Sequence, residues 1–281
     1  MRHTLLLLGS FKGNAKGCLI AEPMWGIPYN LYIAYTSLYM RALGCTAEQI
    51  GIVASVGLIC EMLFSFAGGY VTDRLGRKRT TLIFDLIAWS IPTLIWAAAR
   101  NFSYFIIAAV INSIVRIVFT SWTCLFVEDT PPRRRMYVYT WINVAGTLSG
   151  FFAPLAGLLV SRQGLVPAVR MLYLFAFLSM TVMFILRNHL THETEIGYRK
   201  MKESKNLRFR DVLAEYRDIV GVLRKTPSTM FAFLIVFFGN IQMLYNRTFL
   251  SLLLREGLQF PLALIAVVPA LTSAMKMLIY V

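Results

Sequence analysis

Long runs of apolar side chains, separated by short polar stretches, dominate the pattern of this chain. They follow neither the alternation of a half-buried strand nor the heptads of a soluble helix. A helix needs about 20 mostly apolar residues to cross the hydrocarbon layer of a membrane. Stretches that fit this requirement lie near 17–43, 47–71, 80–99, 102–127, 137–161, 165–186, 229–254 and from 262 onward. The pattern therefore predicts an all-α membrane protein, built as a bundle of about eight transmembrane helices.

The composition favours a membrane protein over a soluble one. Hydrophobic residues make up 57% of the chain and charged residues 15%, against about 25% charged residues in soluble domains. A net charge of +14 would suggest nucleic acid for a soluble protein. Here the basic residues lie in short loops between apolar stretches, so we expect no nucleic-acid partner. The 4 cysteines show no paired spacing, and the sequence predicts no disulfide framework, metal site or cofactor.

Lysine and arginine side chains also predict an orientation. Of the 28 in the chain, most fall in the N-terminal arm and in the loops after the second, fourth and sixth stretches. Few lie at the opposite ends of the stretches. Because cytoplasmic loops carry the excess of Lys and Arg, we expect a multi-pass protein of the plasma membrane with a cytoplasmic N-terminus.

The same pattern suggests four parts. Residues 1–16 form a cytoplasmic arm, 17–186 a six-helix bundle, 187–228 a cytoplasmic linker, and 229–281 the start of a second bundle. Apolar residues recur at helical spacing over 207–223, which predicts an amphipathic helix in the linker. The chain stops inside an apolar run, so we expect a fragment or a truncated product.

A distinctive motif, GGYVTDRLGRKR, occupies residues 68–79 between the second and third stretches. It resembles the signature loop of the major facilitator superfamily of transporters, although Val71 stands where leucine is usual. The matching residues are Gly69, Asp73, Arg74, Gly76, Arg77 and Lys78. The resemblance covers essentially the whole chain. It implies a helical bundle with twelve transmembrane helices, of which about eight are present here, and we expect a monomer.

The resemblance implies that this loop is a cytoplasmic latch, whose charges pair in one conformation and separate in the other. An acidic partner is expected at the cytoplasmic end of the fourth helix, where Glu128 and Asp129 stand. We therefore predict that Arg77 contacts one of these two carboxylates. Asp85, near the same loop, is expected to join this network. The alternative is that the basic cluster only sets the topology.

Two ionisable residues lie deep in their spans and are candidates for energy coupling. Glu61 and Arg116 each fall about fourteen residues into a helix, roughly 20 Å from its outer end. Charges at this depth are costly, so a Glu61–Arg116 pair would neutralise both. Such a pair could protonate and separate during transport, or it could be a static buried pair.

The first helix provides candidates for a substrate cavity, because the resemblance implies that this helix lines the central cavity. Glu22, Tyr29, Tyr32 and Tyr39 fall roughly on one of its faces. A packed aromatic face is the equal alternative for this group. Asn240, near mid-depth in the seventh helix, is a further candidate for substrate contact.

These features together predict a secondary active transporter that moves a small organic solute across the lipid bilayer by alternating access. Proton-coupled efflux of a drug or metabolite is our leading interpretation. A sugar or metabolite uptake symporter and a truncated, non-transporting sensor or remnant are the alternatives. The chain has no HExxH or P-loop motif and no paired intramembrane aspartates, so we do not expect an enzyme.

Overall fold

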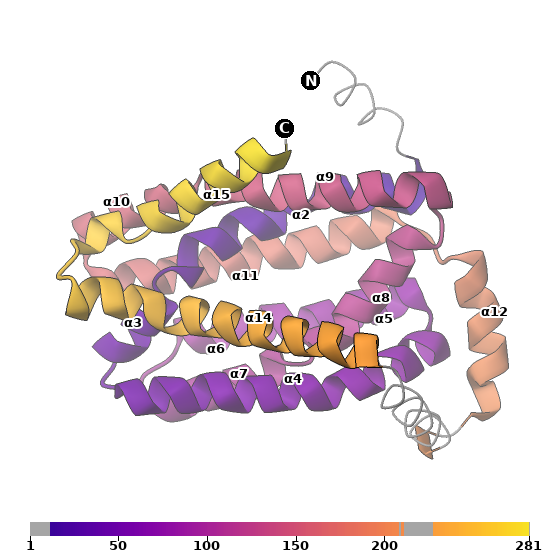
Figure 1. The fold of residues 1–281 in the computed structure, drawn as a ribbon, viewed down its shortest axis with the longest axis horizontal. Coiled ribbons are helices and arrows are strands. Elements are labelled where there is room, and N and C mark those ends of the chain that lie inside the picture. The colour runs from indigo at the N-terminus through magenta and orange to yellow at the C-terminus, as the bar shows by residue number, and fades with distance from the viewer. Residues whose placement is uncertain (1–11, 208, 211–226, 281) are drawn as a thin grey trace.

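The computed structural model describes residues 12–207, 209–210 and 227–280, and within these the regular elements are all helical (Figure 1). In chain order they are α2 (Gly13–Ile33), α3 (Thr36–Ala42), α4 (Ala47–Leu75), α5 (Arg77–Asp85), η1 (Leu86–Ser90), α6 (Ile91–Ala97), α7 (Phe102–Asn112), α8 (Val115–Val127), α9 (Pro132–Gly150), α10 (Ala153–Gln163), α11 (Leu165–Leu190), α12 (Glu195–Glu203), η2 (Ser204–Asn206), α14 (Pro227–Leu252), η3 (Leu253–Gly257), η4 (Leu262–Leu264) and α15 (Val267–Tyr280). Most of the helices run along one axis, and α12 crosses one end of the bundle.

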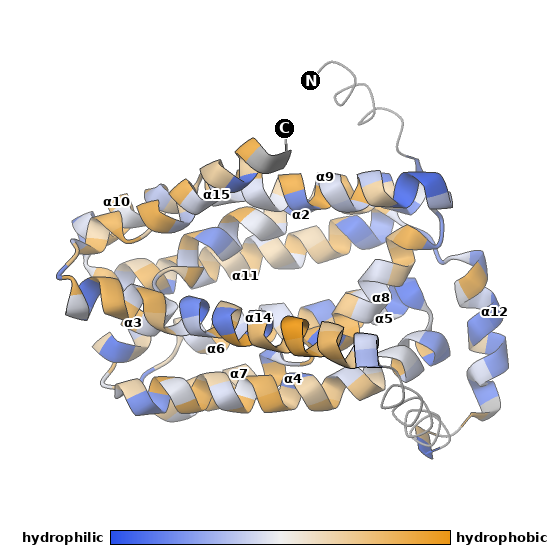
Figure 2. Ribbon diagram, viewed as in Figure 1, coloured by the Kyte–Doolittle hydropathy of each residue, from blue (hydrophilic) through white to orange (hydrophobic). Residues whose placement is uncertain are grey.

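The all-α membrane fold predicted from the sequence is confirmed. In the described part of the chain, 6 helical stretches are long and apolar enough to cross a membrane. They are 47–75, 77–97, 102–127, 132–163, 165–190 and 227–257. Figure 2 shows apolar residues along these helices, whereas hydrophilic residues gather on α12 and at the start of α9. The first and last predicted spans fall outside this set, because α2 carries several polar side chains and the apolar helix 262–278 is shorter.

Three of the predicted spans are interrupted where the sequence suggested continuous helices. The first breaks between α2 and α3, the fourth between α7 and α8, and the fifth between α9 and α10. The last break falls just before Pro154, which has no N–H to continue the helical ladder. Pro28, inside α2, likewise leaves the carbonyl of Met24 without its helical donor. The Ser179 hydroxyl of α11 donates to that carbonyl at 2.7 Å, so a neighbouring helix satisfies the freed backbone group.

Two boundaries differ from those expected. Helix α2 begins at Gly13, so the last residues assigned to the N-terminal arm belong to the helix. Helix α11 continues to Leu190, so Arg187 is a helix residue and not a linker residue. Residues 1–11, and most of the predicted amphipathic segment 207–223, lie outside the described residues.

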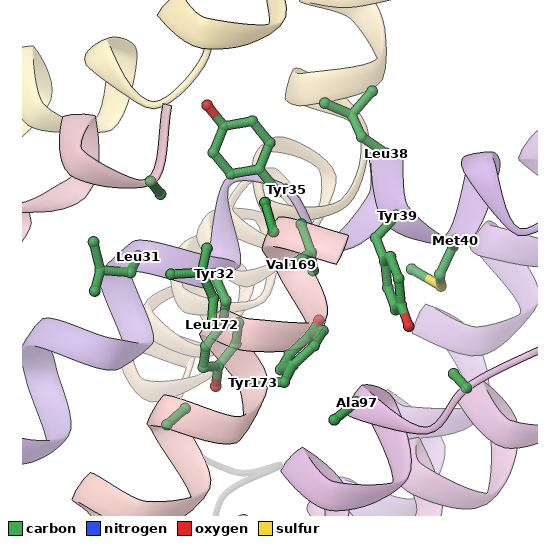
Figure 3. Close-up of a cluster of buried hydrophobic side chains, with 14 of the residues drawn as sticks. Leu31, Tyr32, Tyr35, Leu38, Tyr39, Met40, Ala97, Val169, Leu172 and Tyr173 are labelled. Carbon is green, nitrogen blue, oxygen red and sulfur yellow. The ribbon is translucent and has the colours of Figure 1, made fainter. Parts of the chain in front are cut away.

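Aromatic side chains of the first helix form much of the packed core. Figure 3 shows Tyr32, Tyr35 and Tyr39 beside Val169, Leu172 and Tyr173. The ring of Tyr173 on α11 lies 4.8 Å from that of Tyr32 and 5.8 Å from that of Tyr39, measured between centroids. The Tyr39 hydroxyl donates to the Trp96 carbonyl at 2.9 Å. These contacts join α2 and α3 to α11 and α6, and they set the relative positions of these four helices.

Candidate functional site

Arg77 is the centre of a buried charge cluster at the end of the bundle where α4 meets α5, which we call the motif end. Its side chain is only 4% exposed. Its Nη1 lies 3.0 Å from Asp73 Oδ1. Its Nε and Nη2 donate to the Glu128 carboxylate at distances of 3.0–3.1 Å. This fork-shaped contact is the strong form of an arginine–carboxylate pair. Of the two carboxylates expected to pair with Arg77, the structure brings Glu128 to it.

The turn that presents Arg77 depends on Gly76 and on a distant carboxylate. Gly76 has φ 87°, a conformation that favours glycine. A Cβ there would lie 2.5 Å from Glu193 Oε2. The Glu193 carboxylate accepts hydrogen bonds from the backbone N–H groups of Arg77 and Lys78, each at 3.0 Å. It therefore caps the N-terminus of α5, where free N–H groups and the helix dipole favour a negative charge.

The segment that carries Glu193 also contacts the other members of this charge cluster. Thr194 caps α12 by accepting from the Gly197 N–H at 2.9 Å, and its hydroxyl donates to Glu128. The Ser204 hydroxyl donates to the Asp73 carbonyl at 2.9 Å. Residues 193–204 thus lie across the motif end, in agreement with the position of α12 in Figure 1. The sequence did not suggest these contacts, since about 115 positions separate Glu193 from the helix that it caps.

The other motif residues point away from this cluster or act through their backbone. The Arg74 guanidinium hydrogen-bonds the Tyr70 hydroxyl and lies 5.7 Å from the centre of that ring. Lys78 contributes its backbone N–H. The close approach of α4 to α8 occurs at Gly68, where a Cβ would lie 2.7 Å from Thr120 Oγ1.

Asp129 belongs to a second contact beside the latch. Its Oδ2 lies 2.8 Å from His192 Nε2. Partial burial raises the pKa of the Asp129 carboxyl and nearby Glu128 adds to this rise, while His192 opposes it. The buried amide of Asn14 donates to the carbonyls of Leu125 and His192 at 3.0 and 2.9 Å. It also accepts from the His192 N–H at 2.8 Å. Asn14 therefore ties the start of α2 to the segment that holds the latch.

A separate buried ion pair lies between α5 and α11. Asp85 and Arg187, 2% and 5% exposed, form a salt bridge. Asp85 therefore has Arg187 as its partner, and not the latch residues that we had expected. Glu22 on α2 is also buried and interacts electrostatically with both groups. The structure thus places Glu22 with this pair and away from the aromatic residues of its predicted face.

Glu61 of α4 and Arg116 of α8 lie together. The Arg116 Nη2 and Nε atoms are 2.6 and 2.8 Å from Glu61 Oε2. The Glu61 side chain remains 23% exposed and the Arg116 side chain 44% exposed. Protonation of Glu61 would remove the charge that holds Arg116. The geometry can therefore support either a static pair or a proton-sensitive one.

The tyrosines of the predicted cavity face separate into two groups. Tyr32 and Tyr39 are 2% and 0% exposed and belong to the core, as the alternative of a packed aromatic face predicts. Tyr29 is half-buried and stacks on Trp25 with a centroid distance of 4.7 Å. The Arg247 guanidinium of α14 lies 5.6 Å from the Tyr29 ring centre. Asn240, also on α14, is exposed.

Arg247, which meets Tyr29, was not singled out from the sequence. Its basic side chain within an apolar span was the available signal. Nothing in the residue pattern indicated that it would meet the first helix.

The contacts of α14 and its following turns with the first six helices gather at the end opposite the motif. Ser37 Oγ donates to the Thr248 carbonyl at 2.6 Å. The Tyr35 hydroxyl donates to the Leu262 carbonyl at 2.9 Å. Arg41 and Glu256 form an exposed ion pair at 2.8 Å. By contrast, residues 231–240 of α14 are exposed throughout. Helix α14 therefore meets the first six helices near its C-terminal end and not along residues 231–240.

The described residues form an all-helical bundle of membrane-spanning length with a charged turn between its second and third spans. A family model for the Major Facilitator Superfamily matches residues 24–280, and the chain belongs to this superfamily. It is therefore a transporter-family protein and not an enzyme, as predicted.

Two curated relatives illustrate the similarity. The chain is 29% identical to the uncharacterized MFS-type transporter YqjV of Bacillus subtilis, over 50% of this chain and 36% of YqjV. It is 25% identical to the quinolone resistance protein NorA of Staphylococcus aureus, over 61% of this chain and 44% of NorA. The chain thus spans less than half the length of these relatives.

Proposed function

We propose that the protein acts as a secondary active transporter that moves a small organic solute by alternating access, exporting a drug or metabolite in exchange for protons. The observation that carries this proposal is the uneven contact of α14 with the first six helices. The segment from α14 to η4 meets them through Tyr35, Ser37 and Arg41 at one end, while residues 231–240 of α14 are exposed. A bundle that is closed at one end and open at the other is what alternating access requires.

The distribution of Lys and Arg supports a cytoplasmic position for the motif end and for the N-terminus. On this orientation, in the plasma membrane, the arrangement faces the cytoplasm and its outer end is closed. The Arg41–Glu256 pair and the two hydroxyl contacts then form the outer closure. Arg77, Asp73 and Glu128 form the cytoplasmic latch, whose charges pair in one conformation and separate in the other.

Proton coupling is assigned to the Glu61–Arg116 pair. Both side chains are partly exposed, so the Glu61 carboxylate is not sealed inside the protein. A neutral Glu61 would no longer balance Arg116, and an unbalanced charge at membrane depth is costly. Protonation therefore changes the relative energies of two packings of α4 against α8, which is how a proton can drive a conformational change.

Export is favoured over uptake by the similarity to NorA, a protein named for quinolone resistance.

The direct test is flux in proteoliposomes that contain the full chain, with the fluorescent quinolone norfloxacin as the probe and an imposed pH gradient. We expect proton-driven flux for the wild type. Glu61→Gln should abolish the dependence on the gradient while leaving downhill flux. Glu48→Gln, at an exposed position on the same helix, is the matched control and should behave as the wild type.

The outcomes separate the alternatives. Unchanged gradient dependence in Glu61→Gln would make the Glu61–Arg116 pair a static one. Accumulation in the opposite direction would favour the uptake symporter. Absence of flux for norfloxacin and for sugar or metabolite probes would favour the non-transporting alternative.

A further inference from the structure

Arg247 is a charged side chain at membrane depth that the proposed coupling does not use. It lies 20 residues beyond the start of α14, or about 30 Å along the helix axis, inside the apolar stretch 227–257. A charge in such a position is expensive and is by default a functional candidate. Its side chain is exposed in the described part of the structure.

The surroundings of Arg247 leave its charge unbalanced. Its guanidinium lies against the Tyr29 ring, and among the described residues it has no carboxylate within ion-pair distance and no hydrogen-bond acceptor. The carboxylate of Glu61 on α4 pairs with Arg116 at 2.6 Å and forms no ion pair with Arg247. A net positive charge therefore remains on Arg247.

Aromatic side chains adjoin this charge. Trp25 stacks on Tyr29 with an angle of 13° between the rings. Trp89 meets both rings edge-on, with centroid distances of 5.1 and 5.9 Å. Such a cluster offers apolar surface to a flat ring system. Arginine, in turn, presents N–H groups in a fork that matches the two oxygens of a carboxylate.

We propose that Arg247, together with Tyr29 and Trp25, forms a binding site for an aromatic carboxylate: the guanidinium holds the anionic group and the aromatic cluster packs against the rings. This inference rests on the proposed function, because it names the chemical class of the solute that the transporter would carry. It also assigns the site to α2 and α14, one helix from each of the two parts whose relative position changes in alternating access. An anion bound to Arg247 while its rings pack on Tyr29 would therefore bridge these parts.

A matched pair of probes tests this site. We would measure equilibrium binding of radiolabelled 2-naphthoate and of the neutral 2-naphthamide to the purified full chain in detergent. Charge-assisted hydrogen bonds are worth about 1.5–3 kcal/mol, which corresponds to about tenfold or more in affinity. We therefore expect wild-type protein to bind the acid about tenfold more tightly than the amide.

Variants then locate the preference. Arg247→Gln should remove the preference for 2-naphthoate over 2-naphthamide, because it lowers the affinity for the acid and leaves the affinity for the amide unchanged. Arg247→Lys should retain part of this preference. Arg162→Gln is the control, because it removes an arginine charge from an exposed position at the end of α10. This variant should retain the full preference for the acid. Equal binding of acid and amide to the wild type, binding of neither, or an equal change for both probes in Arg247→Gln would each overturn the proposal. If Arg247→Gln fails to fold, the wild-type preference and its partial retention in Arg247→Lys decide.

Flux measurements keep this inference separate from the proposed function. Preferential binding of the acid without flux would support the site and contradict transport. Flux of norfloxacin with no preference for the acid, and with no effect of Arg247→Gln on binding, would support transport and contradict the site.

Discussion

Replacing Glu128 with glutamine tests the choice of partner for Arg77. The Glu128 carboxylate is 12% exposed and accepts from Arg77 Nε and Nη2. Removing one member of a buried ion pair costs about 3–5 kcal/mol. Asp73 remains 3.0 Å from Arg77 but is 38% exposed, so it offsets only part of this cost. We expect Glu128→Gln to lower the free energy of unfolding by about 2 kcal/mol.

The measurement is thermal unfolding of the full chain in detergent, followed by tryptophan fluorescence. For a domain of roughly this size, about 1 kcal/mol shifts Tm by about 2–4 °C, so a fall of about 4–8 °C is expected. Asp129→Asn, one residue further along the chain, is the matched control, because Asp129 contacts His192 and not Arg77. It should show no such fall at pH 7.5. An unchanged Tm for Glu128→Gln, or an equal fall for Asp129→Asn, would refute the assignment.

Three further predictions follow from the same region and from the opposite end. The raised pKa of Asp129 means that its contribution to stability falls as pH rises through that pKa. In thermal unfolding from pH 4 to 8, Asp129→Asn should therefore match the wild type at acidic pH and equal or exceed it at pH 7.5. Charge reversal by Asp73→Lys should nearly abolish flux while leaving membrane insertion intact, and normal flux would contradict the latch. Cysteines replacing Arg41 and Glu256 should be joined by a short crosslinker, and flux should stop when they are; continued flux would show that this end does not open.

The Arg77–Glu128 contact could be anticipated from the sequence because its chemistry is local. The motif residues lie within a few positions of one turn, and the end of the fourth helix must reach the same side of the membrane after two crossings. Glu128 and Asp129 were therefore both reasonable partners for Arg77. Glu128 is the C-cap of α8, and Asp129 lies in the turn that follows. The packing of this turn decides which carboxylate meets Arg77, and the residue pattern does not reveal that packing.

The sequence failed where one side chain neutralises or caps a distant segment. Arg187 was assigned to the basic linker because it follows the last apolar residues, yet it is buried on α11 against Asp85. Glu193 stands in a polar linker with nothing to mark it, although it caps α5. Arg187 could lie in a solvated loop or in a buried ion pair, and Glu193 could lie in a solvated linker or cap a helix. Long-range packing decides which of these environments each residue has. Charge counting treats every loop cation as topological and therefore cannot identify the cation that a buried carboxylate requires.

Arg247 shows how the two kinds of inference combine. The sequence places several basic residues within the apolar stretches, among them Arg116, Arg170 and Arg247. The structure separates the arginines by their partners: Arg116 has Glu61, and Arg170 donates to the Ala99 carbonyl at 2.9 Å and to the Tyr39 hydroxyl. Arg247 has an aromatic ring beneath it and no acceptor among the described residues. Because an intramembrane guanidinium without an acceptor is costly, a bound anion would lower the free energy of the conformation in which Arg247 meets Tyr29. Solute binding and the relative position of the two parts would then be thermodynamically linked.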